Sequence, residues 1–300
     1  MVLAGPTATG KTDLSLRLAE GRFEIVSADS VQVYRFMDIG SGKPSPEERE
    51  RVRHHCIDIV DPDFDFTAGE FVRRASDAAA EIAGRGKIPL FVGGTGLYMD
   101  SFFTGLSEIP TVDQSIKRDL LHELGEKGLP SLYEALARCD PAFAERIHPN
   151  DRQRILRGLE VFRQCGRPIS SFYVGRVAHG SDDTLFIGLK VERRELADRI
   201  HARVDAMLNA GFIDEVKKLR EMGYGPGLKS MKSIGYAEIN GFFDGTIAAG
   251  ELAEKIKTNT RRYAKRQMTW FGKNERMRWF SPGDEAAIRK AVEEWAGSTA

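Results

Sequence analysis

The residues best suited to chemistry form a phosphate-binding pattern close to the start of the sequence. Residues 5–12 match G-x-x-x-x-G-K-[ST] in full, between a strand-like stretch and a helix-like stretch. Backbone N–H groups and the helix N-terminus would hold phosphate oxygens, while Lys11 adds a charge and Thr12 offers its hydroxyl to Mg²⁺. The pattern predicts polyphosphate binding but does not separate a kinase from a transferase that expels diphosphate. The predicted phosphate-binding residues are Gly5, Pro6, Thr7, Ala8, Thr9, Gly10, Lys11 and Thr12.

Two further polar stretches follow predicted strands. Asp29 comes after a strand at 23–27, and Gly-Gly-Thr-Gly at 93–96 comes after a strand at 88–92. Ligands of open α/β sheets bind beyond the carboxyl ends of the strands, so Asp29 and Thr95 should lie near the phosphate-binding loop. Asp29 could act as a general base or hold a metal through water, and a turn or helix cap is the alternative. For Thr95 the alternative is a helix cap flanked by packing glycines.

Positive charge is concentrated near the carboxyl end of the chain. Segment 255–278 contains nine Lys or Arg residues against one acid, Glu275. A helix would place most of these cations on one face, and its apolar face would include Gln267, which should therefore make a specific hydrogen bond. The cationic face suits binding to a nucleic-acid backbone, with a solvated surface as the alternative. Its members are Lys255, Arg262, Lys265, Arg266 and Lys273.

Strand-like and helical stretches alternate along most of the chain, which predicts an α/β fold with a parallel sheet covered by helices. Between residues 112 and 163 only helical periodicity and helix-ending pairs are found. We therefore expect a P-loop core formed by residues 1–111 and 183–300, which includes the basic helix near the C-terminus. An all-helical subdomain would be inserted at 112–182. The predicted strands are 1–4, 23–27, 88–92 and 184–191.

Several other polar side chains leave more than one interpretation open. In the predicted insert, Gln153, Arg154 and Arg157 share one side of a helix at 151–162 and could contact RNA, although a surface helix explains them nearly as well. Any arginine of the predicted helix at 193–209 that faces the crevice could clamp a diphosphate. Spacing does not choose among Arg193, Arg194, Arg199 and Arg203.

Composition limits the class of protein. The 300 residues are 41% hydrophobic and carry 44 basic and 44 acidic side chains, so any nucleic-acid site must come from a local cluster. The three cysteines are widely spaced and form no CxxC pair, which argues for free thiols and against a cysteine-based zinc site. His54 and His55 lack a third ligand at metal spacing. With neither a leader nor a membrane span in the sequence, we expect a cytoplasmic monomer.

Taken together, the motifs resemble the isopentenyltransferase family, and in particular bacterial tRNA dimethylallyltransferases. The matching stretches occur in order along nearly the whole chain, which makes them far more specific than a phosphate-binding loop alone. They are residues 5–12, 27–34 (Ser-Ala-Asp-Ser-Val-Gln-Val-Tyr), 38–44, 54–59, 93–98, 153–157 (Gln-Arg-Ile-Leu-Arg), 233–236 (Ser-Ile-Gly-Tyr) and 259–271.

The resemblance implies transfer of a dimethylallyl group from dimethylallyl diphosphate to N6 of adenosine 37 in tRNA, with Mg²⁺ present. It implies that Asp29 takes the N6 proton and that Thr95 and Arg203 contact the diphosphate or the reacting centre. It also implies that the helical insert closes around the anticodon stem-loop. Position 117 is Lys where relatives often carry Arg. The expected tRNA-binding residues are Asp29, Ser30, Val31, Gln32, Lys117, Gln153, Arg154, Ile155, Leu156, Arg157, Arg262, Lys265 and Arg266.

Three alternatives compete with this interpretation. An adenylate isopentenyltransferase would prenylate free nucleotide instead of tRNA, although the helical insert and the basic helix favour tRNA. A small-molecule kinase would share the phosphate-binding loop but would need an arginine-bearing lid over ATP. A non-catalytic RNA-binding protein would keep its role after loss of Asp29.

Overall fold

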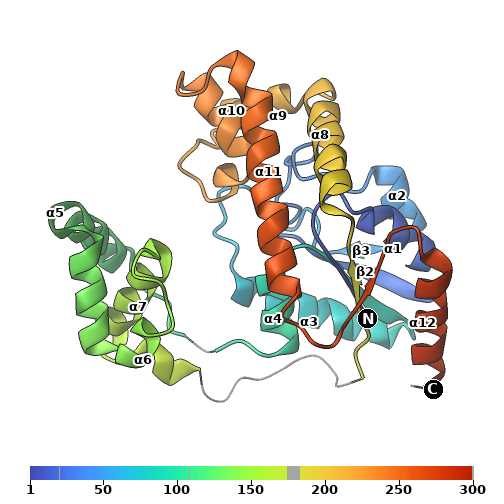
Figure 1. Cartoon of the computed structure of the whole chain (residues 1–300), viewed down its shortest axis with the longest axis horizontal. Coiled ribbons are helices and arrows are strands. Elements are labelled where there is room, and N and C mark those ends of the chain that lie inside the picture. The colour runs from blue at the N-terminus through green and yellow to red at the C-terminus, as the bar shows by residue number, and fades with distance from the viewer. Residues whose placement is uncertain (20, 108, 174–182, 299–300) are drawn as a thin grey trace. The chain divides into compact units, whose positions relative to one another are not determined.

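A computed structural model describes residues 1–19, 21–107, 109–173 and 183–298 (Figure 1). The chain divides into two compact units. The larger unit combines residues 1–103 with 179–300, and the smaller one spans 104–178. The expected insert, 112–182, therefore begins later than the smaller unit, and its last residues, 174–182, lie outside the described part of the chain. Among the described residues, no helix is both long enough and apolar enough to cross a membrane.

The larger unit contains a six-stranded sheet in the order β3-β2-β4-β1-β5-β6. All of its strand pairs are parallel, as the alternation of strands and helices predicts. Two edge strands are absent from the sequence prediction, which has only helix after the fourth strand. β3 is too short to give a periodic signal, and β6 lies in a strongly charged stretch. The strands are β1 (Val2–Ala4), β2 (Phe23–Ala28), β3 (His54–His55), β4 (Ile88–Gly93), β5 (Phe186–Leu189) and β6 (Met277–Phe280).

Helices cover both faces of this sheet. Because side chains alternate along a strand, Leu3 of β1 packs into one apolar cluster while Val2 and Ala4 pack into the other. Leu14 and Ile288, from the first and last helices, join the cluster of Leu3. The helices are α1 (Lys11–Ala19), α2 (Pro46–Arg51), α3 (Ala68–Gly84), α4 (Gly96–Phe103), α8 (Arg193–Asn209), α9 (Phe212–Glu221), α10 (Tyr236–Phe243), α11 (Ala249–Phe271) and α12 (Glu285–Ser298).

The basic segment is only partly helical, which corrects the sequence analysis. Helix α11 ends at Phe271, so Lys273 lies beyond it, and Arg278 belongs to β6. The predicted apolar face is confirmed at Ile256 and Phe271, which are both buried. Trp270 on the same face is more exposed, but its indole N–H donates to Asp100 at 2.7 Å.

The smaller unit is helical in its described residues and has its own core. It contains α5 (Gln114–Cys139), α6 (Pro141–Ala144) and α7 (Arg152–Cys165). Helix α5 is two helices joined at Gly128, whose φ of 75° permits the break. Buried leucines on both halves pack against α7 and give the unit a separate apolar cluster.

A buried carboxylate joins β2 to the neighbouring elements of the larger unit. Glu24 is 2% exposed, and it accepts hydrogen bonds from Arg85 at 2.7 and 3.1 Å. The His55 ring nitrogen Nε2 lies 2.9 Å away. These hydrogen bonds, led by that of Arg85, lower the pKa of Glu24 to about 2. The folded state therefore favours the ionised carboxylate.

We expect Glu24→Gln to reduce the free energy of unfolding at pH 7 by about 1.5–3 kcal/mol, the usual value of hydrogen bonds to a charged group. The wild-type advantage should persist above the ordinary carboxyl pKa and disappear as the pH falls toward 2, because Glu24 then becomes protonated in the folded state too. Urea unfolding at several pH values would measure it. Glu81→Gln, which removes an exposed partner of Arg85 instead, should change little.

Candidate active site

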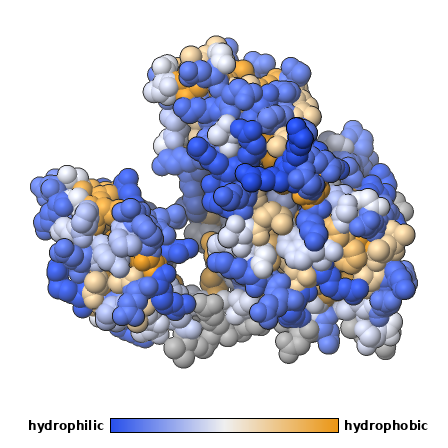
Figure 2. All heavy atoms as spheres, viewed as in Figure 1, coloured by the Kyte–Doolittle hydropathy of each residue, from blue (hydrophilic) through white to orange (hydrophobic). Residues whose placement is uncertain are grey.

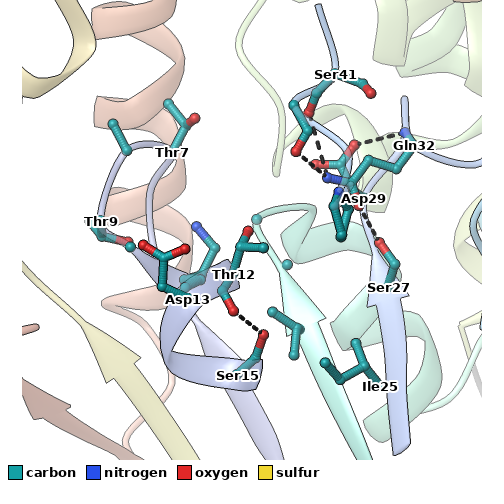
Figure 3. A pocket seen from close by; sticks show the side chains of 18 of the residues that line it. Thr7, Thr9, Thr12, Asp13, Ser15, Ile25, Ser27, Asp29, Gln32 and Ser41 are labelled. Carbon is teal, nitrogen blue, oxygen red and sulfur yellow. Dashed lines mark hydrogen bonds between the residues drawn. The ribbon is translucent and has the colours of Figure 1, made fainter. Parts of the chain in front are cut away.

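A cavity of about 200 Å³ lies beyond the carboxyl ends of β1, β2 and β4. The phosphate-binding loop forms one side, with Thr7, Thr9 and Thr12, and Asp29 and Ser41 lie opposite (Figure 3). The structure thus brings together the three stretches that the sequence analysis places at strand ends. The parallel sheet explains their meeting, because it brings the loops after neighbouring strands to one edge.

The phosphate-binding loop has the backbone conformation of an anion cradle. Gly5 and Gly10 have φ values of 148° and 79°, and Ala8 also has a positive φ. A Cβ on Gly5 would lie 2.6 Å from the carbonyl oxygen of Leu189, so close packing against β5 excludes a side chain there. The Thr9 hydroxyl donates to the Pro6 carbonyl at 2.9 Å and closes the loop. Its N–H groups precede α1 and can bind phosphate oxygens.

Two cations face this cavity. Lys11 donates to the carbonyl oxygen of Pro6 at 2.7 Å, and Arg203 reaches the cavity from α8. Burial and, to a lesser degree, the charge of Arg203 together lower the pKa of Lys11 to about 7, while the charge of Asp29 opposes the shift. Burial also lowers the pKa of Arg203. Neither cation has an ion pair among the described residues, so an anion bound here would stabilise both charges.

Of the four arginines that the sequence leaves open on α8, only Arg203 lines this cavity in the described structure. Arg199 pairs with Glu195 at 2.7 Å, and Arg193 and Arg194 line a separate groove beside α11. His54 lines the cavity, where its Nδ1 lies 2.6 Å from the carbonyl oxygen of Val52. This contact fits a structural role for His54.

Asp29 has one oxygen committed to the backbone. Its Oδ1 accepts the N–H groups of Val31 at 2.8 Å and Gln32 at 3.2 Å, which confirms the turn interpretation. Within the described parts of the chain, Oδ2 makes no hydrogen bond. Asp29 also lines both this cavity and a second one. The turn therefore fixes the carboxylate while leaving one oxygen available for chemistry.

The second cavity, of about 290 Å³, adjoins the first and shares Asp29, Arg203 and Tyr263 with it. Much of its lining is apolar, unlike that of the first cavity. Burial and the charge of Asp29 raise the pKa of Tyr263 to about 12, so its phenol stays protonated at neutral pH. The apolar lining comes from Val31, Val204, Met207, Phe212, Ile234 and Ile256.

Thr95 connects the loops that follow β2 and β4. Its hydroxyl oxygen accepts the N–H of Ser30 at 3.1 Å, and its own N–H donates to the carbonyl oxygen of Ala28 at 3.2 Å. The Thr95 side chain also lies near the Tyr263 phenol and opposes the rise in its pKa. Thr95 therefore lies beside the reactive edge, and its hydroxyl binds a neighbouring loop.

Gln267 makes the specific hydrogen bonds that its place on the apolar face of α11 predicts. Its Oε1 accepts the N–H of Thr7 at 3.0 Å, and its Nε2 donates to the carbonyl oxygen of Gly94 at 2.9 Å. The side chain is buried. A Cβ on Gly94 would lie 2.0 Å from Nε2, so only glycine permits this contact. One amide therefore joins the phosphate-binding loop to the loop after β4.

The sequence analysis missed the segment that closes the cavity beside β2. Gln32, predicted to contact tRNA, accepts the Ser27 hydroxyl at 2.9 Å and donates to the carbonyl oxygen of Gly42 at 3.2 Å. Ser41 and Gly42 thereby line the cavity. The segment is held by α9, more than 170 residues away in sequence. The motif Asp-Ile-Gly-Ser-Gly-Lys at 38–43 marks this segment in the sequence, but it does not indicate which distant residue binds it.

The remaining predicted tRNA-binding residues lie on both units. On α11, Arg262, Lys265 and Arg266 are exposed. In the smaller unit, Gln153 and Arg154 are exposed, whereas Lys117, Leu156 and Arg157 are half-buried. Ile155 is fully buried in that unit's core, which gives its side chain a packing role.

Comparison with known proteins agrees with this geometry. The sequence model described as IPP transferase matches residues 32–275, and one described as isopentenyl transferase matches residues 1–61. A tRNA dimethylallyltransferase 2 from Geotalea uraniireducens is 52% identical over 285 residues, covering 93% of this chain and 91% of the relative. A tRNA dimethylallyltransferase from Geobacter sulfurreducens is 48% identical, covering 93% and 90%.

Solved structures show the same similarity. The full-length tRNA isopentenylpyrophosphate transferase from Bacillus halodurans is 37% identical, with a TM-score of 0.70 over 99% of this chain and 98% of that one. A eukaryotic dimethylallyltransferase acting on tRNA is 33% identical, with a TM-score of 0.74 over 90% of this chain and 69% of that one. The chain therefore belongs to the IPP transferase family.

Proposed function

We propose that this protein transfers a dimethylallyl group from dimethylallyl diphosphate to N6 of adenosine 37 in tRNA and releases diphosphate. The observation that carries the proposal is the pair of joined cavities that meet at Asp29. One has the phosphate-binding loop and two cations, and the other adds several apolar side chains to its polar lining. A diphosphate ester with a short hydrocarbon group requires both environments. Family membership supports the same reaction.

The diphosphate would bind between the phosphate-binding loop and Arg203. As the bond between the prenyl carbon and the diphosphate oxygen breaks, negative charge grows on the leaving group. The loop N–H groups, Lys11 and Arg203 are already directed at the cavity, so they stabilise this charge without reorganising. The half-buried site strengthens each of these electrostatic interactions.

Asp29 would act as the general base. Adenine N6 is a weak nucleophile, so its proton must leave as the new C–N bond forms. In this step N6 bonds to the prenyl carbon, the C–O bond breaks, diphosphate leaves with the electron pair, and a carboxylate oxygen of Asp29 takes the proton. Because Oδ1 accepts two backbone N–H groups, we assign the proton to Oδ2. Thr95 and Tyr263 flank this position and would orient the adenine.

The site also fits the Mg²⁺ that the family's chemistry implies. In the described part of the chain there is no group of three or more His, Cys, Asp or Glu residues that could hold a metal. A cation here would therefore take most of its ligands from diphosphate oxygens and water, as in other phosphate-binding loops, with Thr12 as the protein ligand. When bound, Mg²⁺ would neutralise diphosphate charge.

The tRNA would bind through cations and exposed polar side chains. Arg262, Lys265 and Arg266 of α11 are exposed and can contact phosphates. Figure 2 shows hydrophilic side chains gathered over α8 and α11. In the helical unit, Gln153 and Arg154 present amide and guanidinium groups suited to a single-stranded loop. Adenosine 37 must leave its stack to reach Asp29, which costs a few kcal/mol and favours a loop over a duplex. We expect the reaction to occur in the cytoplasm.

A labelling experiment tests the proposal. The purified protein is incubated with radiolabelled dimethylallyl diphosphate, Mg²⁺ and either unmodified tRNA or AMP. We expect label in tRNA at the adenosine 3′ of the anticodon. Label in AMP would assign the chain to the nucleotide-using branch. Label in neither, with consumption of [γ-³²P]ATP, would instead indicate a kinase or NTPase.

Asp29→Asn separates the two roles of this side chain. The amide oxygen can still accept the N–H groups of Val31 and Gln32, but the group no longer takes a proton. We expect single-turnover transfer to slow by about 10²–10⁴-fold, the usual contribution of a general base, with tRNA affinity unchanged. Asp29→Ala should also keep tRNA binding while transfer slows to a similar extent. Near-normal turnover in Asp29→Asn would rule out the base assignment.

Gln267→Met tests the amide that joins the two loops. Methionine fills a similar volume but leaves the Thr7 N–H and the Gly94 carbonyl without this partner. We expect the protein to lose about 1–3 kcal/mol of stability, the cost of unsatisfied buried polar groups. The KM for dimethylallyl diphosphate should rise more than the KM for tRNA. Glu251→Met, at an exposed position of the same helix outside its cationic face, is the matched control. Equal changes in both KM values would contradict the assignment.

A further inference from the structure

A carboxylate on α9 binds three successive backbone N–H groups of loop 38–42. Glu215 Oε2 accepts the N–H groups of Asp38 at 2.9 Å and Ile39 at 2.6 Å, and Oε1 accepts that of Gly40 at 3.2 Å. Oε1 also accepts the Tyr236 hydroxyl at 2.7 Å. Hydrogen bonds to an ionised acceptor are about twice as strong as those between neutral groups. Residues 38–40 are therefore held mainly by one side chain, while Gln32 holds the far end of the loop through the Gly42 carbonyl oxygen.

The packing around Glu215 leaves the loop no room to move inward. Tyr236 is fully buried, and its ring packs edge-to-face on Phe212 with centroids 4.9 Å apart. A Cβ on Gly40 would lie 2.2 Å from the Phe212 ring and 2.6 Å from the Tyr236 ring. The loop backbone thus lies directly against both aromatic side chains, and its hydrogen bonds to the carboxylate hold it in this position.

The far end of the same loop supports Arg203. Gly42 has a φ of 58°, and a Cβ there would lie 2.0 Å from a terminal nitrogen of the Arg203 guanidinium. The guanidinium therefore rests on the Gly42 backbone. Among the described residues, Arg203 has no hydrogen bond or ion pair that could hold it otherwise. Its position in the diphosphate cavity depends on where the loop lies.

We propose that Glu215 is a positioning residue for diphosphate binding, which acts through loop 38–42 and Gly42 on the Arg203 guanidinium. The proposal rests on the proposed function in assigning the diphosphate of dimethylallyl diphosphate to this cavity. Glu215 touches neither cavity. We expect its effect to fall on the anion rather than on tRNA, because the loop that it holds supports Arg203. A merely structural role would instead lower stability without changing anion affinity.

Glu215→Gln is the first test, with Glu221→Gln, an exposed carboxylate on the same helix, as the matched control. A glutamine has an NH₂ group in place of one carboxylate oxygen. This NH₂ group would face the backbone N–H groups, so at least one N–H would lose its acceptor. We expect the calorimetric Kd for inorganic diphosphate and the KM for dimethylallyl diphosphate to rise about tenfold, a coupling typical of residues in one network. The tRNA affinity of Glu215→Gln and the diphosphate affinity of Glu221→Gln should stay within about twofold of the wild-type values, as for sites without shared partners.

A double-mutant cycle separates positioning from stability. In an Arg203→Lys background, Glu215→Gln should cause little further loss of diphosphate affinity, because the group that it positions is gone. Gly42→Ala, which displaces the guanidinium without touching Glu215, should reproduce the tenfold loss even if Glu215→Gln does not fold. Unchanged diphosphate affinity in either folded variant, or multiplied effects in the double mutant, would overturn the proposal. Inorganic diphosphate binding needs neither tRNA nor prenyl transfer, so it remains informative if the proposed reaction is wrong.

Discussion

The arrangement of the site depends on one buried amide. Gln267 of α11 accepts a hydrogen bond from the phosphate-binding loop and donates one to the loop after β4. The two loops follow different strands, and the helix that joins them lies far away in sequence. A buried polar group must be hydrogen-bonded, so this geometry is strongly specified once α11 packs on the sheet. Position 94 must be glycine, because a Cβ there would clash with the Gln267 amide. Helix, loops and cavity therefore assemble together.

Electrostatics then determines what the cavity can accept. Lys11 and Arg203 are both partly desolvated, and Asp29 is the acid that acts on both. Two cations facing one carboxylate leave the site short of negative charge. A diphosphate supplies that charge and makes the buried cations favourable. The rest of the donor can then pack on the apolar part of the adjoining cavity, where Val204, Met207 and Ile256 lie among polar and charged side chains.

The sequence predicts those parts of this fold that local chemistry dictates. The turn conformation of the phosphate-binding loop and the buried strands β2 and β4 follow from residue types at fixed spacing, and the structure confirms them. Strands β3 and β6 were missed because edge strands of two and four residues leave no periodicity. Glu215 was missed because its partners lie about 175 residues away, and no helical pattern indicates which exposed-looking carboxylate will bind a distant loop.

The two interpretations of Asp29 that the sequence leaves open are not exclusive. A free carboxylate at a strand end would rotate between rotamers, and each turn away from the adenine would slow proton transfer. Two backbone N–H groups on Oδ1 remove that freedom and leave Oδ2 with a defined direction. The turn thus provides the orientation that a general base requires, and it does so before any substrate binds. The same residue type at the same strand end, without residues 31 and 32 in this turn, would be a poorer base.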